Sequence, residues 1–199
     1  MSCFPEESTI WLEPIELKYL REKTVWRILD KILNGRGGGE YLEAKSGYLK
    51  GEIIGRSSYY VRTDKERNLT IVEACVCASG NFDPRKEFQY CNEALARAKR
   101  ELEWWYNRKK REDLDSELRE LVEKGIKVWE EKKEKAMNWY QEVENYISDL
   151  NDLLYRTRRT LEKLKEIDNE IDRGSFKSLI EYVGEDYVKE RLKEIFLKK

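Results

Sequence analysis

The longest periodic pattern in the chain is a stripe of apolar positions between residues 136 and 171. Its members recur at alternating steps of three and four residues: Ala136, Trp139, Val143, Tyr146, Leu150, Leu153, Thr157, Thr160, Leu164, Ile167 and Ile171. Four more apolar residues directly follow every second member: Tyr140, Ile147, Leu154 and Leu161. A strict two-stranded coiled coil needs only the first set. The wider face therefore predicts a long helix that is buried over a broad arc, as in a hairpin or a bundle.

Two partners for this helix fit the pattern equally well. One is the segment 114–128, which carries Leu118, Leu121 and Val122 and would fold back through a join near Gly125. The other is the same helix of a second copy, which would make the protein a homodimer. The threonines within the stripe loosen the seam and indicate control of register rather than maximal stability.

A second helix is predicted after residue 82. Asp83 is a good N-cap residue and Pro84 suits the first helical position. Apolar residues then recur with helical spacing at Phe88, Cys91, Leu95, Ala98, Leu102 and Trp105. We expect this stripe to cover a β-sheet.

The segment 40–78 predicts that sheet. It contains four strand-like runs, EYLEA, YLKGEII, SSYYVRT and NLTIVEACVCA, each bounded by Gly, Ser, Asn or Asp. The last run is apolar on both faces apart from Glu73, so we expect it to be the central strand. The third run would expose Tyr60 and Arg62 together on one face of the sheet.

The N-terminal region predicts a short strand over residues 8–13, followed by a helix that begins at Pro14. This helix should end at the sequence NGRGGG (residues 34–39), where Asn or Gly can adopt the left-handed conformation of a C-cap. The glycines lack the G-x-x-x-x-G-K-[ST] spacing of a phosphate-binding loop and follow a helix instead of opening one. They therefore predict a flexible joint.

The sequence DRGSF (residues 172–176) ends the long helix, and two short helices are predicted after it. Together these patterns predict an α+β fold, in which a small antiparallel sheet with flanking helices precedes a long helical hairpin or coiled-coil-like region and short C-terminal helices. The boundaries that we derive are 1–112 for the α+β domain, 113–173 for the hairpin region and 174–199 for the C-terminal helices.

Composition removes several classes of function. The chain has no histidine, the commonest general base and transition-metal ligand. Its cysteines, Cys3, Cys75, Cys77 and Cys91, form no CxxC pair, so buried thiols are a better interpretation than a zinc site. We expect a non-enzymatic protein without a metal or a small-molecule cofactor.

The sequence also indicates a compartment. No apolar run approaches the length of about 18 residues that a transmembrane helix needs. The N-terminus lacks the basic and apolar regions of a signal peptide, so we expect an intracellular, cytoplasmic protein without a membrane partner. Abundant Lys and Glu with only two Gln, Gln89 and Gln141, favour a thermophilic source, archaeal or viral.

Charge is balanced over the whole chain but not along it. The 39 basic and 40 acidic residues nearly cancel, so no global field attracts a polyanion. Residues 81–112, however, hold 9 basic and 6 acidic residues around the sequence WWYNRKKR. Any basic patch must therefore be local, and we expect it in this segment.

Helical geometry divides the aromatic residues of that segment. At about 100° per residue, Trp105 and Tyr106 fall on or beside the apolar stripe and are predicted to be core, whereas Trp104 points to the opposite side. The outer arc around Trp104 is mostly basic and carries Lys86, Tyr90, Arg97, Arg100, Arg108 and Arg111.

An exposed tryptophan among arginines is typical of surfaces that bind single-stranded nucleic acid, because guanidinium groups contact phosphates while the ring stacks on a base. We therefore predict a nucleic-acid-binding protein that prefers single-stranded DNA or RNA and self-associates as a dimer, with Trp104, Arg97, Arg100, Arg108, Arg111, Lys86 and Tyr90 as its site. The alternative is a structural, assembly or adaptor protein, in which Trp104 packs under other helices and the arginines pair with glutamates.

A remote alternative is a magnesium-dependent nuclease. Glu43 and Lys45 have the E-x-K spacing of such enzymes, in which the carboxylate holds the metal and the lysine steadies the attacking water. The site would also need an upstream acidic residue on an adjacent strand. Asp30 is the nearest upstream aspartate, and it is predicted to lie on a helix.

Overall fold

One helix, α3 (Ser116–Asp172), is the spine of the computed structural model, which describes residues 9–78 and 82–196. Its 57 residues extend over about 86 Å. Asp115 caps the helix by accepting the backbone N–H of Leu118 at 2.8 Å. At the other end Gly174 adopts a left-handed φ of 77°. The stripe predicted over residues 136–171 lies within α3 and is buried within one chain.

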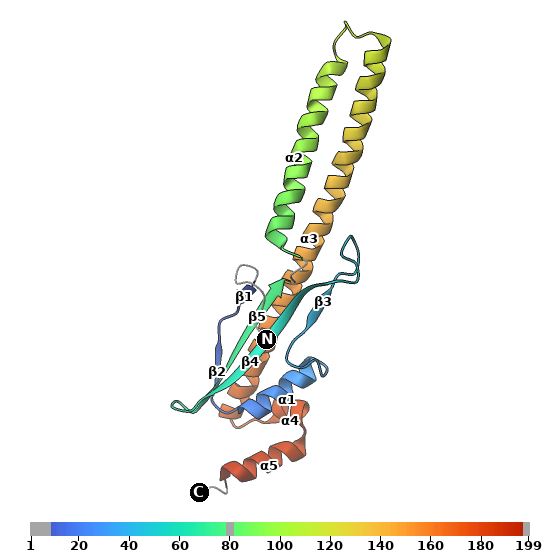
Figure 1. Cartoon of the computed structure of the whole chain (residues 1–199). Coiled ribbons are helices and arrows are strands. Elements are labelled where there is room, and N and C mark those ends of the chain that lie inside the picture. Colours follow the sequence, from blue (N-terminus) through green and yellow to red (C-terminus); the bar gives the residue numbers. More distant parts are fainter. Residues whose placement is uncertain (1–8, 79–81, 197–199) are drawn as a thin grey trace.

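The helical hairpin consists of α2 (Pro84–Lys109) and the first half of α3, which run antiparallel and are joined by residues 110–115 (Figure 1). Asp83 caps α2 as predicted, because its side chain accepts the backbone N–H groups of Arg85 and Lys86. A small apolar cluster holds the two helices together near the turn: Leu102, Trp105, Leu114, Val122, Ile126 and Trp129. The hairpin projects well beyond the sheet (Figure 1).

Two expectations about this hairpin are wrong. Gly125 does not join two helices but lies inside α3. A Cβ atom at Gly125 would stand 2.6 Å from the ring of Trp105, so the glycine allows a close approach of α2 rather than a turn. The stripe of α2 does not cover the sheet either, because α2 packs along α3.

The sheet has five strands, β1 (Thr9–Trp11), β2 (Ile15–Leu17), β3 (Tyr41–Glu43), β4 (Ile53–Asp64) and β5 (Leu69–Ala78). All pairings are antiparallel, in the order β1-β5-β4-β3, and β2 also pairs with β5. The central position of β5 confirms the prediction. By contrast, most of the second predicted run (residues 48–54) forms a turn, and only its last residues, Ile53 and Ile54, join the third run in β4. Gly55 of β4 lies so close to α3 that a Cβ atom there would be 2.3 Å from Leu150.

The helix predicted from Pro14 begins later, as α1 (Glu22–Ile32). Residues 15–17 form β2 instead, with Ile15 opposite Val72, and Leu17 is fully buried. Proline can lie between two short strands because it needs no N–H partner in the ladder. The end of α1 is as predicted, since Asn34 and Gly35 have left-handed φ values of 54° and 77°.

The main core lies between one face of the sheet and two helices, α1 and the second half of α3. Figure 1 shows α3 running along the sheet and α1 near its end. The buried residues include Leu17, Val25, Ile28, Leu29, Tyr59, Val72, Ala74, Leu161, Leu164 and Ile167. Two short helices, α4 (Lys177–Val183) and α5 (Glu185–Phe196), close this end of the molecule.

A buried carboxylate fixes α3 to the N-terminal segment. The backbone N–H groups of Lys18, Tyr19 and Leu20 donate to Asp168 at 2.8, 2.8 and 2.9 Å. Asp168 is only 3% exposed, so the polar groups of the turn between β2 and α1 find their partner inside the protein. One side chain thus holds together segments that are 150 positions apart in sequence.

We predict that Asp168→Ala lowers the free energy of unfolding by about 3 kcal/mol, because it leaves the buried N–H of Leu20 and the part-buried N–H groups of Lys18 and Tyr19 without their acceptor. Urea denaturation followed by circular dichroism measures this loss. Asp152→Ala is the control, since Asp152 is exposed on the same helix and should change stability by less than about 0.5 kcal/mol. Equal effects of the two substitutions would contradict the structural role of Asp168.

Candidate nucleic-acid interface

The row of side chains along the outer arc of α2 is the basis of the predicted site. Tyr90, Arg97 and Trp104 follow one another at steps of seven residues, which is about two helical turns. They therefore point to the same side of α2, whereas Arg111, the next residue of this predicted series, lies beyond Lys109, the last residue of the helix. Trp104 is 46% exposed, as the helical arithmetic predicts, and Tyr90 is also exposed.

The two aromatic residues after Trp104 behave differently. Trp105 packs into the hairpin against Gly125, as predicted for a core residue. Tyr106 is not core but 41% exposed. Its hydroxyl donates a hydrogen bond to Glu130 at 2.5 Å, and this bond raises the pKa of Tyr106. The expectation fails because Tyr106 lies at the edge of the stripe, where its ring can reach across to α3 instead of entering the core.

Trp104 already has neighbours on the protein. The guanidinium carbon of Arg108 lies over its ring, 4.3 Å from the centroid, and Trp105 meets it edge-on at 4.7 Å. A base that stacks on the face covered by Arg108 must first displace that guanidinium group. Trp104 is thus an accessible ring, but the contact with Arg108 occupies part of its surface.

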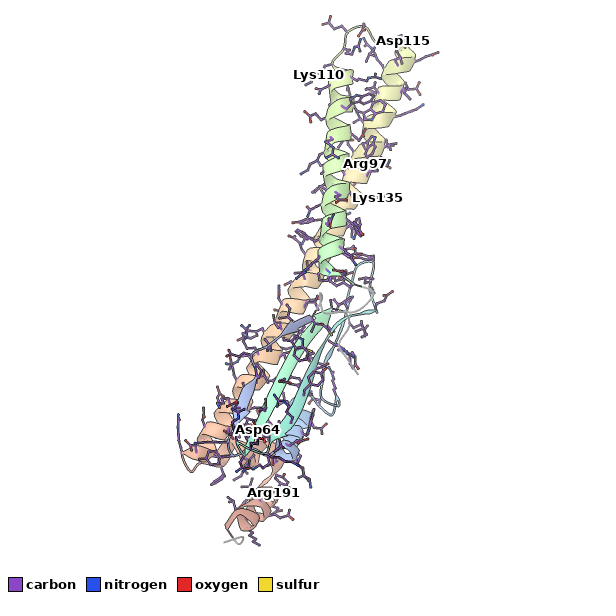
Figure 2. The ribbon with its side chains drawn as sticks, turned by 60° about the vertical axis from the view of Figure 1, so that its left-hand side comes forward. Asp64, Arg97, Lys110, Asp115, Lys135 and Arg191 are labelled. Carbon is purple, nitrogen blue, oxygen red and sulfur yellow. The ribbon has the colours of Figure 1, made fainter. Side chains whose placement is uncertain are left out.

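A groove between the two helices lies closer to the middle of the hairpin. From α2 it is lined by Tyr90, Glu93, Ala94, Arg97 and Ala98, and from α3 by Trp129, Lys132, Lys135, Ala136 and Trp139. Small alanine side chains bring the helices close together and leave room between the larger residues. Figure 2 shows Arg97 and Lys135 on neighbouring helices at the middle of the hairpin.

The electrostatics of this groove are basic. Three cationic side chains, Arg97, Lys132 and Lys135, stand against one carboxylate, Glu93. The Lys132 ammonium lies 4.0 Å from the centroid of the Trp129 ring, and the Arg97 guanidinium carbon lies 5.9 Å from it. Such contacts hold cations beside an aromatic surface without neutralising their charge.

The other predicted site residues are more dispersed. Lys86 pairs with Asp83 at 3.4 Å, near the start of α2. Arg111 lies at the far end, where it makes a two-pronged contact with Asp113 at 3.0 and 2.7 Å that lowers the pKa of the Asp113 carboxyl. Arg100 is exposed but lies about 60° farther round α2 from Arg97, on the side away from the groove. The structure therefore brings only Tyr90 and Arg97 of the predicted set into the groove.

The α3 half of the groove is missing from the predicted set. Trp129, Lys132, Lys135 and Trp139 become neighbours of Arg97 only because α2 pairs with α3. Trp129 nevertheless carries a sequence signal, since it continues the seven-residue series of Ala136 and Val143 toward Val122. Extending the stripe in this direction would have predicted a continuous helix through Gly125.

The residues of the predicted magnesium-nuclease site lie on different elements. Glu43 lies on β3 opposite Ile53, whereas Asp30, the upstream carboxylate, lies on α1. Within residues 9–78 and 82–196, no three His, Cys, Asp or Glu side chains are placed to hold a metal ion together.

Cys75, Cys77 and Cys91 are buried thiols, as predicted, and Cys3 lies outside the described residues. Among the described helices, none has an apolar stretch of the length that crossing a bilayer requires.

Comparison with protein-family models, with curated proteins and with solved structures finds no match to this chain.

We predict a large loss of stability for one of the two adjacent tryptophans and a small change for the other. Trp105→Ala should lower the free energy of unfolding by about 2 kcal/mol or more, because it removes a ring that packs against Gly125. Trp104→Ala should change it by less than about 1 kcal/mol, since that side chain is exposed. Urea denaturation of both variants gives the comparison. A large loss for Trp104→Ala would place Trp104 in the core and remove it from the outer surface.

Proposed function

We propose that the protein is a non-catalytic nucleic-acid-binding protein that prefers single strands. The observation that carries this proposal is the groove of the hairpin, where three aromatic rings and three cations surround a narrow floor of alanines: Tyr90, Trp129, Trp139, Arg97, Lys132 and Lys135. Trp104 and Arg108 would extend this surface along α2 toward the turn. We place this binding function inside the cell, because free thiols such as those of the buried cysteines are typical of reducing compartments.

The mixture of rings and cations favours an unpaired strand. Lysine and arginine contact phosphates of any nucleic acid, but an aromatic side chain stacks on a base only where the face of that base is accessible. In a duplex the neighbouring base pairs cover these faces. The aromatic residues of the groove would therefore contribute to binding of a single strand and add little to binding of a duplex.

The attraction must be local, because the chain as a whole has a net charge of −1. Binding should accordingly fall steeply with salt, with a slope of about 0.7 per phosphate contact for single strands. A few contacts of this kind give modest affinity. A dimer would raise it by presenting two grooves to one strand.

A second candidate function is assembly, and a different observation favours it. Leu118, Leu121 and Val128 are exposed, and their helical spacing places them along one side of α3 near the turn of the hairpin. The stripe that first indicated a dimer is covered within the chain, whereas this shorter row is not. It offers apolar surface for a second copy.

We predict that Lys132→Gln with Lys135→Gln weakens binding of a labelled single-stranded oligonucleotide by about tenfold and reduces the salt slope by about 1.4, because two phosphate contacts are lost. Fluorescence anisotropy over a series of salt concentrations measures both quantities. Single-stranded and duplex oligonucleotides of equal length are compared for each variant.

The matched control is Lys99→Gln with Lys127→Gln, which changes the net charge equally. Lys99 lies about 200° round α2 from Arg97, and Lys127 lies about 140° round α3 from Lys132; both are exposed. This control should bind nearly as the unaltered protein does. Equal losses in the two double variants would mean that general charge, and not the groove, governs binding, and no binding at low salt would refute the proposal.

Assembly has its own prediction. If the exposed row on α3 joins two copies, sedimentation velocity should find a dimer for the unaltered protein and a monomer for Leu121→Glu with Val128→Glu, because a carboxylate is costly to bury in an apolar contact. A monomer already in the unaltered protein at micromolar concentration would contradict assembly through this row.

A further inference from the structure

One edge of the sheet is only partly covered, because β4 is longer than its outer neighbour β3. β3 pairs with β4 as far as Arg56. The last backbone bond on this side runs from the N–H of Tyr59 to the carbonyl of Gly38, at 3.0 Å. β4 continues to Asp64 and remains paired with β5 over this length (Figure 1). Among the described residues, no strand pairs with the β3 side of β4 beyond Tyr59.

The open stretch of β4 presents a defined set of backbone groups. The N–H and C=O groups of successive residues in a strand point to opposite edges. Because the N–H of Tyr59 points toward Gly38, the groups of Val61 and Thr63 point to the same edge, whereas those of Arg62 point to β5. Thr63 is exposed and Val61 is half-buried. Two residues therefore offer their N–H and C=O groups at an edge that solvent reaches.

The chain leaves this edge at two glycines. Gly37 and Gly38 have left-handed φ values of 58° and 85°, which direct the backbone from the end of α1 into β3. If the pairing continued in the same register, residues 34–36 would lie opposite Val61 and Thr63. Those residues instead form the turn that follows α1. The glycine segment thus ends the cover of β4 at a fixed position.

A groove lies along α1 beside this edge. Its volume is about 740 Å³, and it is lined by Glu22, Lys23, Trp26, Arg27, Asp30, Gly37 and Gly38. Two of these residues are bonded to β4: Gly38 accepts the N–H of Tyr59, and Glu22 accepts the hydroxyl of Thr63 at 3.1 Å. The groove therefore extends from the last covered residue of β4 to the end of the open stretch.

We infer that this edge binds an extended segment of a partner protein, which adds to β4 as a further strand and places a side chain in the groove beside Trp26. Backbone donors and acceptors that recur every two residues, about 6.8 Å apart, are matched by another polypeptide strand and not by a nucleic acid. The surface is separate from the hairpin, so this inference does not depend on the proposed function.

The groove favours an apolar side chain over a charged one. Its two basic residues, Lys23 and Arg27, are balanced by two acidic residues, Glu22 and Asp30. Trp26 is its large apolar side chain, and a Cβ atom at Gly38 would stand 2.8 Å from the ring. In strand addition the main-chain bonds supply affinity and the side-chain pockets supply selectivity. We therefore expect an aliphatic or aromatic residue of the partner segment to lie against Trp26.

A second copy of this chain fits the edge less well. Two β4 strands can pair antiparallel about a two-fold axis, and the register that joins the free groups of Val61 and Thr63 in both copies is centred on Arg62. That register places the Arg62 side chains of the two copies directly opposite each other. Like charges at opposed positions destabilise a strand pair. The edge is better matched by a segment of different sequence.

Hydrogen exchange measured by nuclear magnetic resonance tests whether the edge is open. We expect the amide protons of Val61 and Thr63 to exchange at least about a hundredfold faster than those of Tyr60 and Arg62, which are bonded to β5. The measurement uses the unaltered protein. Equal protection of the four amides would mean that the edge is already covered and would overturn the inference.

A phage-displayed library of random dodecapeptides supplies the probe for binding. Peptides selected on the unaltered protein are synthesised with a fluorescent label, and their affinities for two variants are compared by anisotropy. Thr63→Pro removes the N–H at the open edge, where a strand tolerates proline, and should weaken binding by about tenfold or more. Thr63→Val keeps this N–H and loses only the hydroxyl bond to Glu22, so it should bind as the unaltered protein does.

Equal binding of the selected peptides by the two variants would overturn the inference, and so would a library that yields no binder. A dimer of the unaltered protein that becomes a monomer in Thr63→Pro would identify a second copy as the occupant and would also overturn it. Circular dichroism checks the fold of each variant. If Thr63→Pro impairs folding, N-methylation at alternate residues of the selected peptide removes the same bonds from the other side and should weaken binding equally.

Discussion

The whole architecture depends on covering one very long helix. α3 carries apolar side chains along most of its 57 residues, and a helix of this length is stable in water only where that stripe is buried. The apolar stripe is covered by α2 along the first half of α3 and by the sheet and α1 along the second half. The single rigid helix therefore links the hairpin to the sheet, and Asp168 fixes its far part to the turn between β2 and α1.

This division of the helix leaves two surfaces of the molecule open to solvent. Because only α2 covers the first half of α3, the hairpin projects from the sheet and has broad solvent-facing sides (Figure 1). Small residues, Ala98, Gly125 and Ala136, bring its helices together and leave the larger rings and cations at the margins. Because α1 and α3 cover the same face of the sheet, the rings of Trp11 and Tyr60 on the other face remain accessible.

Much of the fold could be predicted from local patterns. The stripe of α3, the Asp83 cap, the central β5 and the left-handed end of α1 each follow from a few neighbouring residues. The errors arose where tertiary contacts decide. Gly125 suggested a turn because glycine often ends helices, but here it accommodates Trp105. The pattern after Pro14 predicts a helix for residues 15–17, but pairing with β5 makes them a strand.

Only part of the candidate site could likewise be predicted from local patterns. Helical geometry identified the side of α2 on which Tyr90, Arg97 and Trp104 lie, since that arrangement is local. It could not identify Trp129 and Lys132, because these residues join Arg97 only when α2 docks on α3 in one particular register. Nor does helical geometry predict the exposed position of Tyr106, because its hydroxyl donates a hydrogen bond to Glu130 on the opposite helix.

We propose that bases stack on the groove of the hairpin, and the six tryptophans of the chain allow a direct test. Each indole N–H gives a separate signal in a nitrogen–proton correlation spectrum, so a titration with a single-stranded oligonucleotide shows which rings it contacts. We expect saturable shifts for Trp129 and Trp139, which line the groove, and little change for Trp26, which packs against Gly38. Unchanged Trp129 and Trp139 signals at saturating oligonucleotide would contradict this proposal.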